Sequence, residues 1–146
     1  MALPTGGGTE TLHSHLFENV DATQTLILGV QHHVYTVLSI TAKCNVLGST
    51  TNTGGINLIG YDLHSSASAR GMALATFNIV VGETFVWNDK FSFNGYEPTG
   101  TPSLNAAGQI AVAAQGGSVA QQLSFVQTST TDDFDVFVTY IDQDWS

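Results

Sequence analysis

The chain has 146 residues, the length of one ordinary domain, and 42% of them are apolar, which is enough for a single hydrophobic core. Three basic residues stand against twelve acidic ones, for a net charge of −9. This balance excludes the clustered Lys and Arg that nucleic-acid phosphates or anionic lipids require. Charged residues make up only 10% of the chain, against about 25% in an average domain. A surface of Thr, Ser, Asn, Gln and Gly loses little when it is desolvated, so the composition fits an assembly component or an ordinary polar β-protein.

The N-terminal region carries neither the basic nor the apolar segment of a secretory signal, so we expect synthesis in a cytoplasm. No apolar run approaches the roughly 18 residues of a membrane span, and we expect no membrane partner. Cys44 is the only cysteine, which excludes an intramolecular disulfide. It lies in an apolar register and is expected to be a small buried hydrophobe.

Residues 1–10 are predicted to form an extended arm, because Pro4 and the glycines at 6–8 resist regular structure. The arm is either a disordered leader or a clamp on neighbouring subunits. In the second case Leu3 and Pro4 are its candidate contact residues.

Residues 11–146 are predicted to form one domain in which nearly every regular element is a β-strand. The expected strands are Leu12–Val20, Thr25–Val30 with a bulge at Gly29, Val34–Val46, Ile56–Leu63, Leu74–Val81, Thr84–Trp87, Lys90–Phe93, Leu123–Thr128 and Phe134–Ile141. The clearest alternation runs from Val34 to Val46. One predicted face carries Val34, Thr36, Leu38, Ile40, Ala42, Cys44 and Val46, and the other carries Tyr35, Val37, Ser39, Thr41, Lys43 and Asn45.

Three segments between these strands are predicted to be loops, at 48–55, 64–71 and 96–122. The last holds two prolines and several glycines, so it resembles an insertion, with a short strand possible at 110–114. Thr84–Trp87 and Lys90–Phe93 form either a hairpin that turns at Asn88-Asp89 or one strand with its aromatic residues on one face.

About eight strands without a helical period predict an all-β fold, an antiparallel β-sandwich or jelly roll with an extended N-terminal arm.

Histidines provide the first candidate site. His13 and His15 share one face of a predicted strand, and with His32, His33 and His64 they are potential metal ligands in a cupin-like barrel. Glu18, the only acidic residue near the pair, falls on the opposite face. Structural or interface histidines are therefore the preferred interpretation, and no metal site is assigned.

Aspartates around the last predicted strand provide the second candidate site. Asp132, Asp133, Asp135, Asp142 and Asp144 offer oxygen ligands for Ca²⁺, but they lack EF-hand spacing. Aspartates that protect a strand edge from aggregation explain the same pattern.

No catalytic or cofactor motif is present in the sequence. The Gly-x-Ser-x-Gly elbow, the Walker A pattern and the dinucleotide pattern are missing, and no carboxylate pair is marked out by its surroundings. We expect no enzyme and no cofactor. Trp87, Tyr96 and Trp145 are candidates for a sugar-stacking platform; Trp87 is expected in the core, and Tyr96 and Trp145 at contact surfaces.

The order of several segments resembles that of small β-sandwich structural proteins of tailed bacteriophages, of the capsid decoration or cement type. The matching segments are TQTLIL at 23–28, HVYTVLSI at 33–40, GETFVW at 82–87 and DVFVTYIDQDW at 135–145. The resemblance covers residues 11–95 and 123–146, and its motifs describe strands and turns.

The resemblance implies a virion protein on the capsid surface, made in the host cytoplasm, that binds the major capsid protein and forms a homo-oligomer, typically a trimer. It implies no catalytic residues, and Trp145 would anchor subunit contacts. The alternatives are a carbohydrate- or receptor-binding module of a phage fibre and a small metal-binding cupin-like protein.

Overall fold

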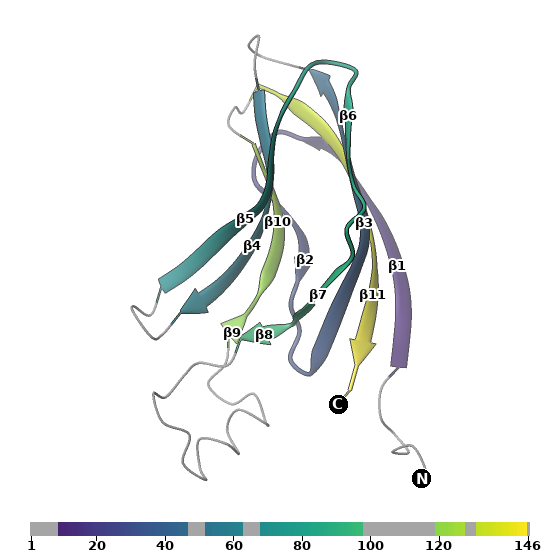
Figure 1. Cartoon of the computed structure of the whole chain (residues 1–146), viewed down its shortest axis with the longest axis vertical. Coiled ribbons are helices and arrows are strands. Elements are labelled where there is room, and N and C mark those ends of the chain that lie inside the picture. The colour runs from purple at the N-terminus through teal and green to yellow at the C-terminus, as the bar shows by residue number, and fades with distance from the viewer. Residues whose placement is uncertain (1–8, 47–51, 63–67, 98–118, 128–130, 146) are drawn as a thin grey trace.

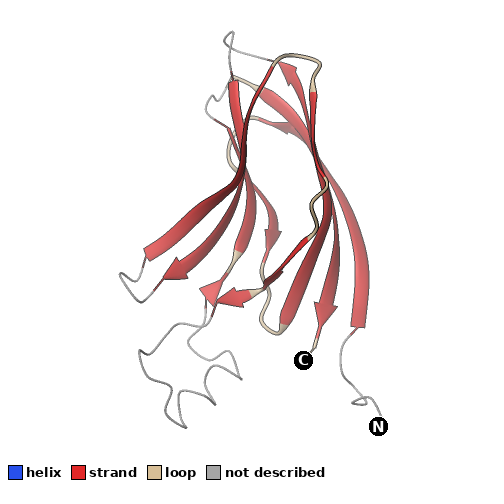
Figure 2. Ribbon diagram, viewed as in Figure 1, coloured by secondary structure: helices blue, strands red, loops and turns tan. Residues whose placement is uncertain are grey.

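The computed structural model describes residues 9–46, 52–62, 68–97, 119–127 and 131–145. Every regular element in these ranges is a β-strand, and two antiparallel sheets face each other (Figures 1 and 2). The predicted all-β antiparallel sandwich is confirmed. Within the same ranges, no helix has the length and apolar character needed to cross a membrane.

The two sheets contain five and four strands. Sheet A consists of β1 (Thr9–Val20), β11 (Asp133–Asp144), β3 (His33–Val46), β6 (Thr84–Trp87) and β7 (Phe91–Asn94). Sheet B consists of β2 (Gln24–Leu28), β10 (Gln122–Gln127), β4 (Asn52–Asp62) and β5 (Ser68–Ile79). A small third sheet pairs β8 (Tyr96–Glu97) with β9 (Val119–Ala120).

The strand order is that of a jelly roll. Sheet A runs β1-β11-β3 and then β6 and β7, which both pair with β3, while sheet B runs β2-β10-β4-β5. When β6 and β7 are taken as one interrupted strand, consecutive strands mostly alternate between the sheets, as in the double Greek key of that fold. The first and last strands, β1 and β11, therefore lie side by side.

The core lies between the sheets and is built from alternate residues of the long strands. Its fully buried apolar members are Val37, Ile40, Ala42, Cys44, Ile56, Leu123, Phe125, Phe134, Val136 and Val138. The predicted burial of Cys44 is confirmed. Burial, and then the nearby Asp132 carboxylate, raise the pKa of its thiol, which favours the neutral, unreactive form.

A bulge in β3 reverses part of the predicted alternation. Tyr140 pairs with Val37 and Thr139 with Ser39, so Leu38 is the extra residue. On the N-terminal side of the bulge, Tyr35 and Val37 face the core. The prediction that they share the face opposite Ile40 is wrong, because one inserted residue moves every preceding side chain to the other face.

Several predicted boundaries also need correction. β1 includes Thr9 and Glu10, which pair with Asp144 and Gln143, so the arm does not extend to residue 10. β4 begins at Asn52 and β5 at Ser68, inside segments predicted as loops. Residues 1–8, with Leu3 and Pro4, lie outside the described residues, as do His64 and the possible strand at 110–114.

β6 and β7 do not form a hairpin, because both pair with β3. The alternative of one strand with an aromatic face is the better description: Phe85, Trp87 and Phe91 are half-buried against the core, and Phe93 is buried. Residues 88–90, which have no regular structure, therefore interrupt the strand without reversing it, and the predicted turn at Asn88-Asp89 is wrong.

Gly29 and Gly95 allow a close backbone approach between the two sheets. A Cβ on Gly29 would lie 1.9 Å from the Gly95 carbonyl oxygen, and a Cβ on Gly95 would lie 2.1 Å from the Val30 carbonyl oxygen. Backbone hydrogen bonds run through the same point: the N–H of Gly29 donates to Gln121, that of Gln121 to Gly95, and that of Gly95 to His33. Gly29 thus permits a close backbone approach. β2 ends before it at Leu28, so the prediction of a strand to Val30 with a bulge at Gly29 is wrong at this end.

We expect Gly95→Ala to destabilise the protein by about 1–3 kcal/mol or more, because the methyl group would meet backbone atoms that cannot move alone. Urea unfolding measures the loss. Gly71→Ala is the matched control, since its Cβ would lie at an ordinary 3.7 Å from Ile59 Cγ1. Equal unfolding midpoints for both variants would contradict the assigned crossing.

Candidate functional site

The outer face of sheet A, the side turned away from the core, carries neutral side chains in cross-strand rows. One row joins Leu16, Phe137, Thr41 and Val86, each directly opposite the next on β1, β11, β3 and β6. Leu16 is 53% exposed, Phe137 40% and Val86 50%, so the apolar members of the row are open to solvent. Leu16 and Phe137 are direct neighbours and Thr41 separates them from Val86; exposed apolar groups gathered on one face are a feature of contact surfaces.

A second row on the outer face joins Leu12, Ile141, Thr36 and Ser92. Between the two rows, the hydroxyls of Ser14 and Thr139 lie 3.1 Å apart, and in the second row those of Thr36 and Ser92 lie 2.8 Å apart. These hydroxyls hydrogen-bond to each other, so burial of the face would not leave them unsatisfied.

Charges lie at the two ends of the outer face. Glu10 lies beyond the Leu12 row and accepts a hydrogen bond from Gln143. Asp135 and Lys43, which pair with each other across β11 and β3, lie beyond the Leu16 row. The middle of the face therefore resembles the charge-depleted centre of a protein interface, with polar residues at its rim.

The inner face of sheet A gathers the predicted histidines beside the core. His13 and His15 of β1 stack at a ring-centroid distance of 5.7 Å, and His13 stacks on Tyr140 of β11 at 5.1 Å. His33 of β3 stacks on Tyr35 at 6.0 Å. The prediction that His13 and His15 share a face agrees with this geometry.

Asp142 is the acidic partner that sequence reasoning missed. Its Oδ1 lies 2.6 Å from His33 Nδ1, and its Oδ2 lies 3.9 Å from His13 Nε2. Asp144 Oδ2 lies 3.7 Å from His33 Nε2. The expectation that Glu18 is the only nearby acid is wrong, because Asp142 comes from β11, far away in sequence but adjacent in the sheet.

Two tyrosines adjoin this carboxylate. Burial, then the charge of Asp142, raise the pKa of Tyr35 to about 12, and the same two causes raise the pKa of Tyr140. The Val30 N–H donates a hydrogen bond of 3.1 Å to the Tyr35 hydroxyl oxygen. Both tyrosines therefore stay neutral at ordinary pH and act as structural groups.

A metal centre is not assembled in the part of the chain that the structure describes, where no group of three or more His, Cys, Asp or Glu residues could hold an ion. The aspartates of the predicted calcium cluster are also divided. Asp132, Asp133 and Asp135 lie at one end of β11 and Asp142 and Asp144 at the other, about 30 Å away at the rise of a strand.

Trp145 directly follows β11 and contacts the turn that precedes β3. Its ring meets His32 edge-on at a centroid distance of 4.7 Å, and its backbone N–H donates to the His32 carbonyl oxygen. Trp145 is 44% exposed, so part of its surface stays accessible to solvent beside the contact with His32. Tyr96 lies half-buried on β8. Trp87, on β6, donates its indole N–H to the Asp89 carbonyl oxygen. The three residues of the predicted sugar-stacking platform, Trp87, Tyr96 and Trp145, thus lie on separate elements.

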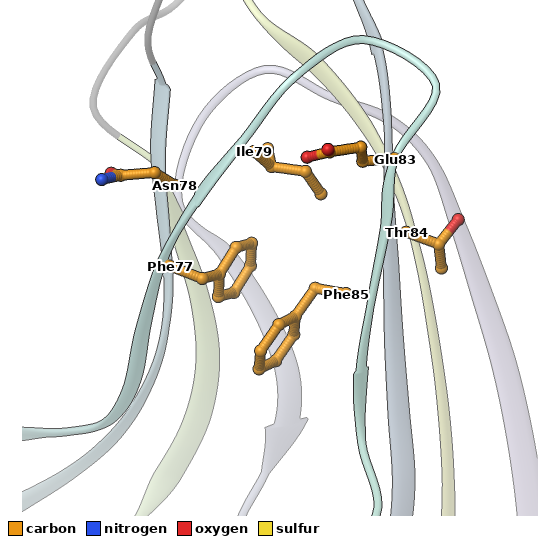
Figure 3. A pocket seen from close by; sticks show the side chains of 6 residues that line it. All are labelled: Phe77, Asn78, Ile79, Glu83, Thr84 and Phe85. Carbon is orange, nitrogen blue, oxygen red and sulfur yellow. The ribbon is translucent and has the colours of Figure 1, made fainter.

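A small pocket of about 300 Å³ opens between β5 and β6 (Figure 3). The rings of Phe77 and Phe85 stack there at 3.9 Å and nearly parallel. Glu83 accepts the Val80 N–H with Oε2, so this carboxylate holds the turn between the strands. Of the six residues that line the pocket, Glu83 is the ionisable one.

No protein-family model and no curated protein sequence matches the chain. Among solved structures, the chain is similar to one from the disulfide-linked pili of Bacillus endospore appendages, with 9% identity and a TM-score of 0.42 over 96% of this chain and 90% of that one. It is also similar to the N-terminal modules of an endo-1,4-β-D-xylanase of Clostridium thermocellum solved with xylohexaose, with 16% identity and a TM-score of 0.42 over 92% and 26% of the two chains.

A third similarity is to a chain of infectious bursal disease virus, with 9% identity and a TM-score of 0.39 over 94% of this chain and 35% of that one. The chain thus spans about a third or less of the viral and xylanase chains. At these identities and TM-scores none of the similarities carries an argument about what this chain binds.

We expect stability to fall as pH rises from 10 to about 12, because the unfolded chain ionises Tyr35 near its usual pKa of 10.0 while the folded chain resists ionisation until about 12. The contribution is complete below pH 10, and its loss approaches about 2–3 kcal/mol. Tyr35→Phe should cost about 1 kcal/mol at neutral pH, through the hydrogen bond to Val30, and should flatten the alkaline loss. Urea unfolding across this pH range measures both; parallel curves for variant and wild type would contradict the assignment.

Proposed function

We propose that this chain is a non-enzymatic structural protein of a virus particle, a decoration or cement subunit that binds the shell of major capsid protein and stabilises the head. The observation that carries the proposal is the outer face of sheet A, exposed and without charge from the Leu12 row to the Leu16 row. Its location would be the capsid surface, and the particle would be that of a tailed bacteriophage, as the sequence resemblance implies.

The face has the properties that a large protein contact requires. Its apolar rows gain roughly 25 cal/mol for each Å² of apolar surface removed from water. Its paired hydroxyls, Ser14 with Thr139 and Thr36 with Ser92, keep their hydrogen bonds when water leaves. β11 and β3, which form the middle of this face, each pair with neighbouring strands on both sides. The surface is therefore ordered before it binds a partner.

The ionisable groups support a role without catalysis. His33 and Asp142 bond to each other, and Glu83 holds a turn. Tyr35 and Tyr140 are kept neutral by burial and by Asp142. Each of these side chains thus has a hydrogen-bond or ring-stacking partner. Of the five, only Glu83 lines the pocket between β5 and β6.

Val86→Lys should weaken binding to capsids that lack the protein, because it places a charge in the apolar row. The position is already solvent-exposed in the free protein, so the fold should tolerate the change. Loss of one desolvated apolar contact, with an unpaired charge added, is expected to weaken binding by at least tenfold. Co-sedimentation with capsids measures binding, and heat release of packaged DNA measures stabilisation.

Met72→Lys is the matched control, since Met72 is an equally exposed apolar residue on β5 of sheet B. It should bind as the wild type does. Capsid binding that Val86→Lys leaves unchanged, or wild-type protein that neither binds capsids nor raises their heat stability, would refute the proposal.

A further inference from the structure

β1 forms an open edge of sheet A. Among the described strands it pairs only with β11, so the other side of its backbone offers unpaired N–H and C=O groups (Figure 1, the strand marked β1). Natural proteins protect such edges with lysines, prolines, bulges or very short strands, because an open edge is a template for another strand.

The segment from Thr11 to Phe17 has none of these protections. It contains no Lys, Arg, Asp, Glu or Pro, and it pairs with β11 without a register shift. The opposite edge of sheet A, in contrast, is broken into the four-residue strands β6 and β7. β2, at one edge of sheet B, has five residues, and β5, at the other edge, pairs with β4 through a register shift between Ile56 and Asn57.

We propose that two copies of this chain associate through their β1 strands, in antiparallel register about a two-fold axis at Ser14, so that sheet A continues from one copy into the other. The self-complementary sequence of the segment sets this register. Ser14 then lies opposite Ser14 of the second copy, and Leu12 lies opposite Leu16 on the outer face. On the inner face His13 lies opposite His15.

This register joins the outer faces of the two copies into one. Leu12 is 66% exposed and Leu16 53% in a single chain, and each would gain an apolar cross-strand neighbour. Backbone hydrogen bonds would supply the remaining attraction, as in other cases of strand addition to a sheet edge. A two-fold contact of one segment with itself also closes, so it produces a dimer and not a fibre.

Both ends of the segment limit the strength of the contact. After Phe17 the pairing with β11 shifts, and Asn19 adopts a positive φ of 54°, which turns the chain out of the straight edge. Glu10 and Glu18 flank the segment, and each would approach the other residue of the second copy. The dimer should therefore form reversibly and become stronger with added salt, which screens this repulsion.

Two charge variants at the two-fold axis test the register directly. Ser14→Lys and Ser14→Glu should each be monomeric alone, because like charges would meet across the axis, whereas an equal mixture should form a heterodimer. Sedimentation velocity over a concentration series measures both, with the wild type expected to change from monomer to dimer. Val86→Lys is the control: it lies at the far edge of sheet A and should dimerise normally, although the proposed capsid binding would be weakened.

Hydrogen exchange provides a measurement without substitution. The amide protons of Thr11–Phe17 that point away from β11 should exchange more slowly as the wild-type concentration rises. A wild type that stays monomeric or forms a trimer, a Ser14→Lys variant that dimerises alone, a mixture that stays monomeric, or exchange rates independent of concentration would each overturn the proposal. Because none of these measurements involves capsids, the two proposals fail independently.

Discussion

The crossing of Gly29 and Gly95 is the constraint on which the rest of the structure depends. Their backbones approach so closely that neither position has space for a Cβ, and a continuous run of backbone hydrogen bonds passes through Gln121 and Gly95 to His33. This run links the end of β2 and the start of β10 in sheet B to β7 and β3 in sheet A. The separation of the sheets at this end is thereby fixed, and with it the positions of His33, Asp142 and Trp145.

The two faces of sheet A serve different purposes, although the same strands build both. Along the inner face, the apolar core is followed first by Tyr35 and Tyr140 and then by the hydrogen-bonded pair His33 and Asp142. The outer face stays neutral along its middle and places its charges at the ends. The charged side chains of sheet A described above thus either lie at the ends of the outer face, as Asp135 and Lys43 do, or bond to neighbours on the inner face, as Asp142 does.

Most of the strands could be predicted from the sequence, because alternation and turn residues are local signals. The bulge at Leu38 could not be predicted, because apolar residues occupy both faces of β3 there. From the sequence alone, Tyr35 and Leu38 are equally suitable as core residues. The pairing of His33 and His13 with Asp142 was equally out of reach, since it depends on β11 lying between β1 and β3. The stacked histidines were predictable because their spacing needs only the period of one strand.

The position of β11 has a consequence for how the molecule is made. The last described strand is not at an edge but in the middle of sheet A, between β1 and β3, which are synthesised much earlier. Until this segment leaves the ribosome, sheet A cannot close, and the strand pairs that it supplies join residues from 87 apart (Asp133 and Val46) to 135 apart (Thr9 and Asp144) in the sequence. A chain cut short before β11 would lack the strand that joins β1 to β3. Sheet A can therefore close only after the chain has been synthesised as far as β11.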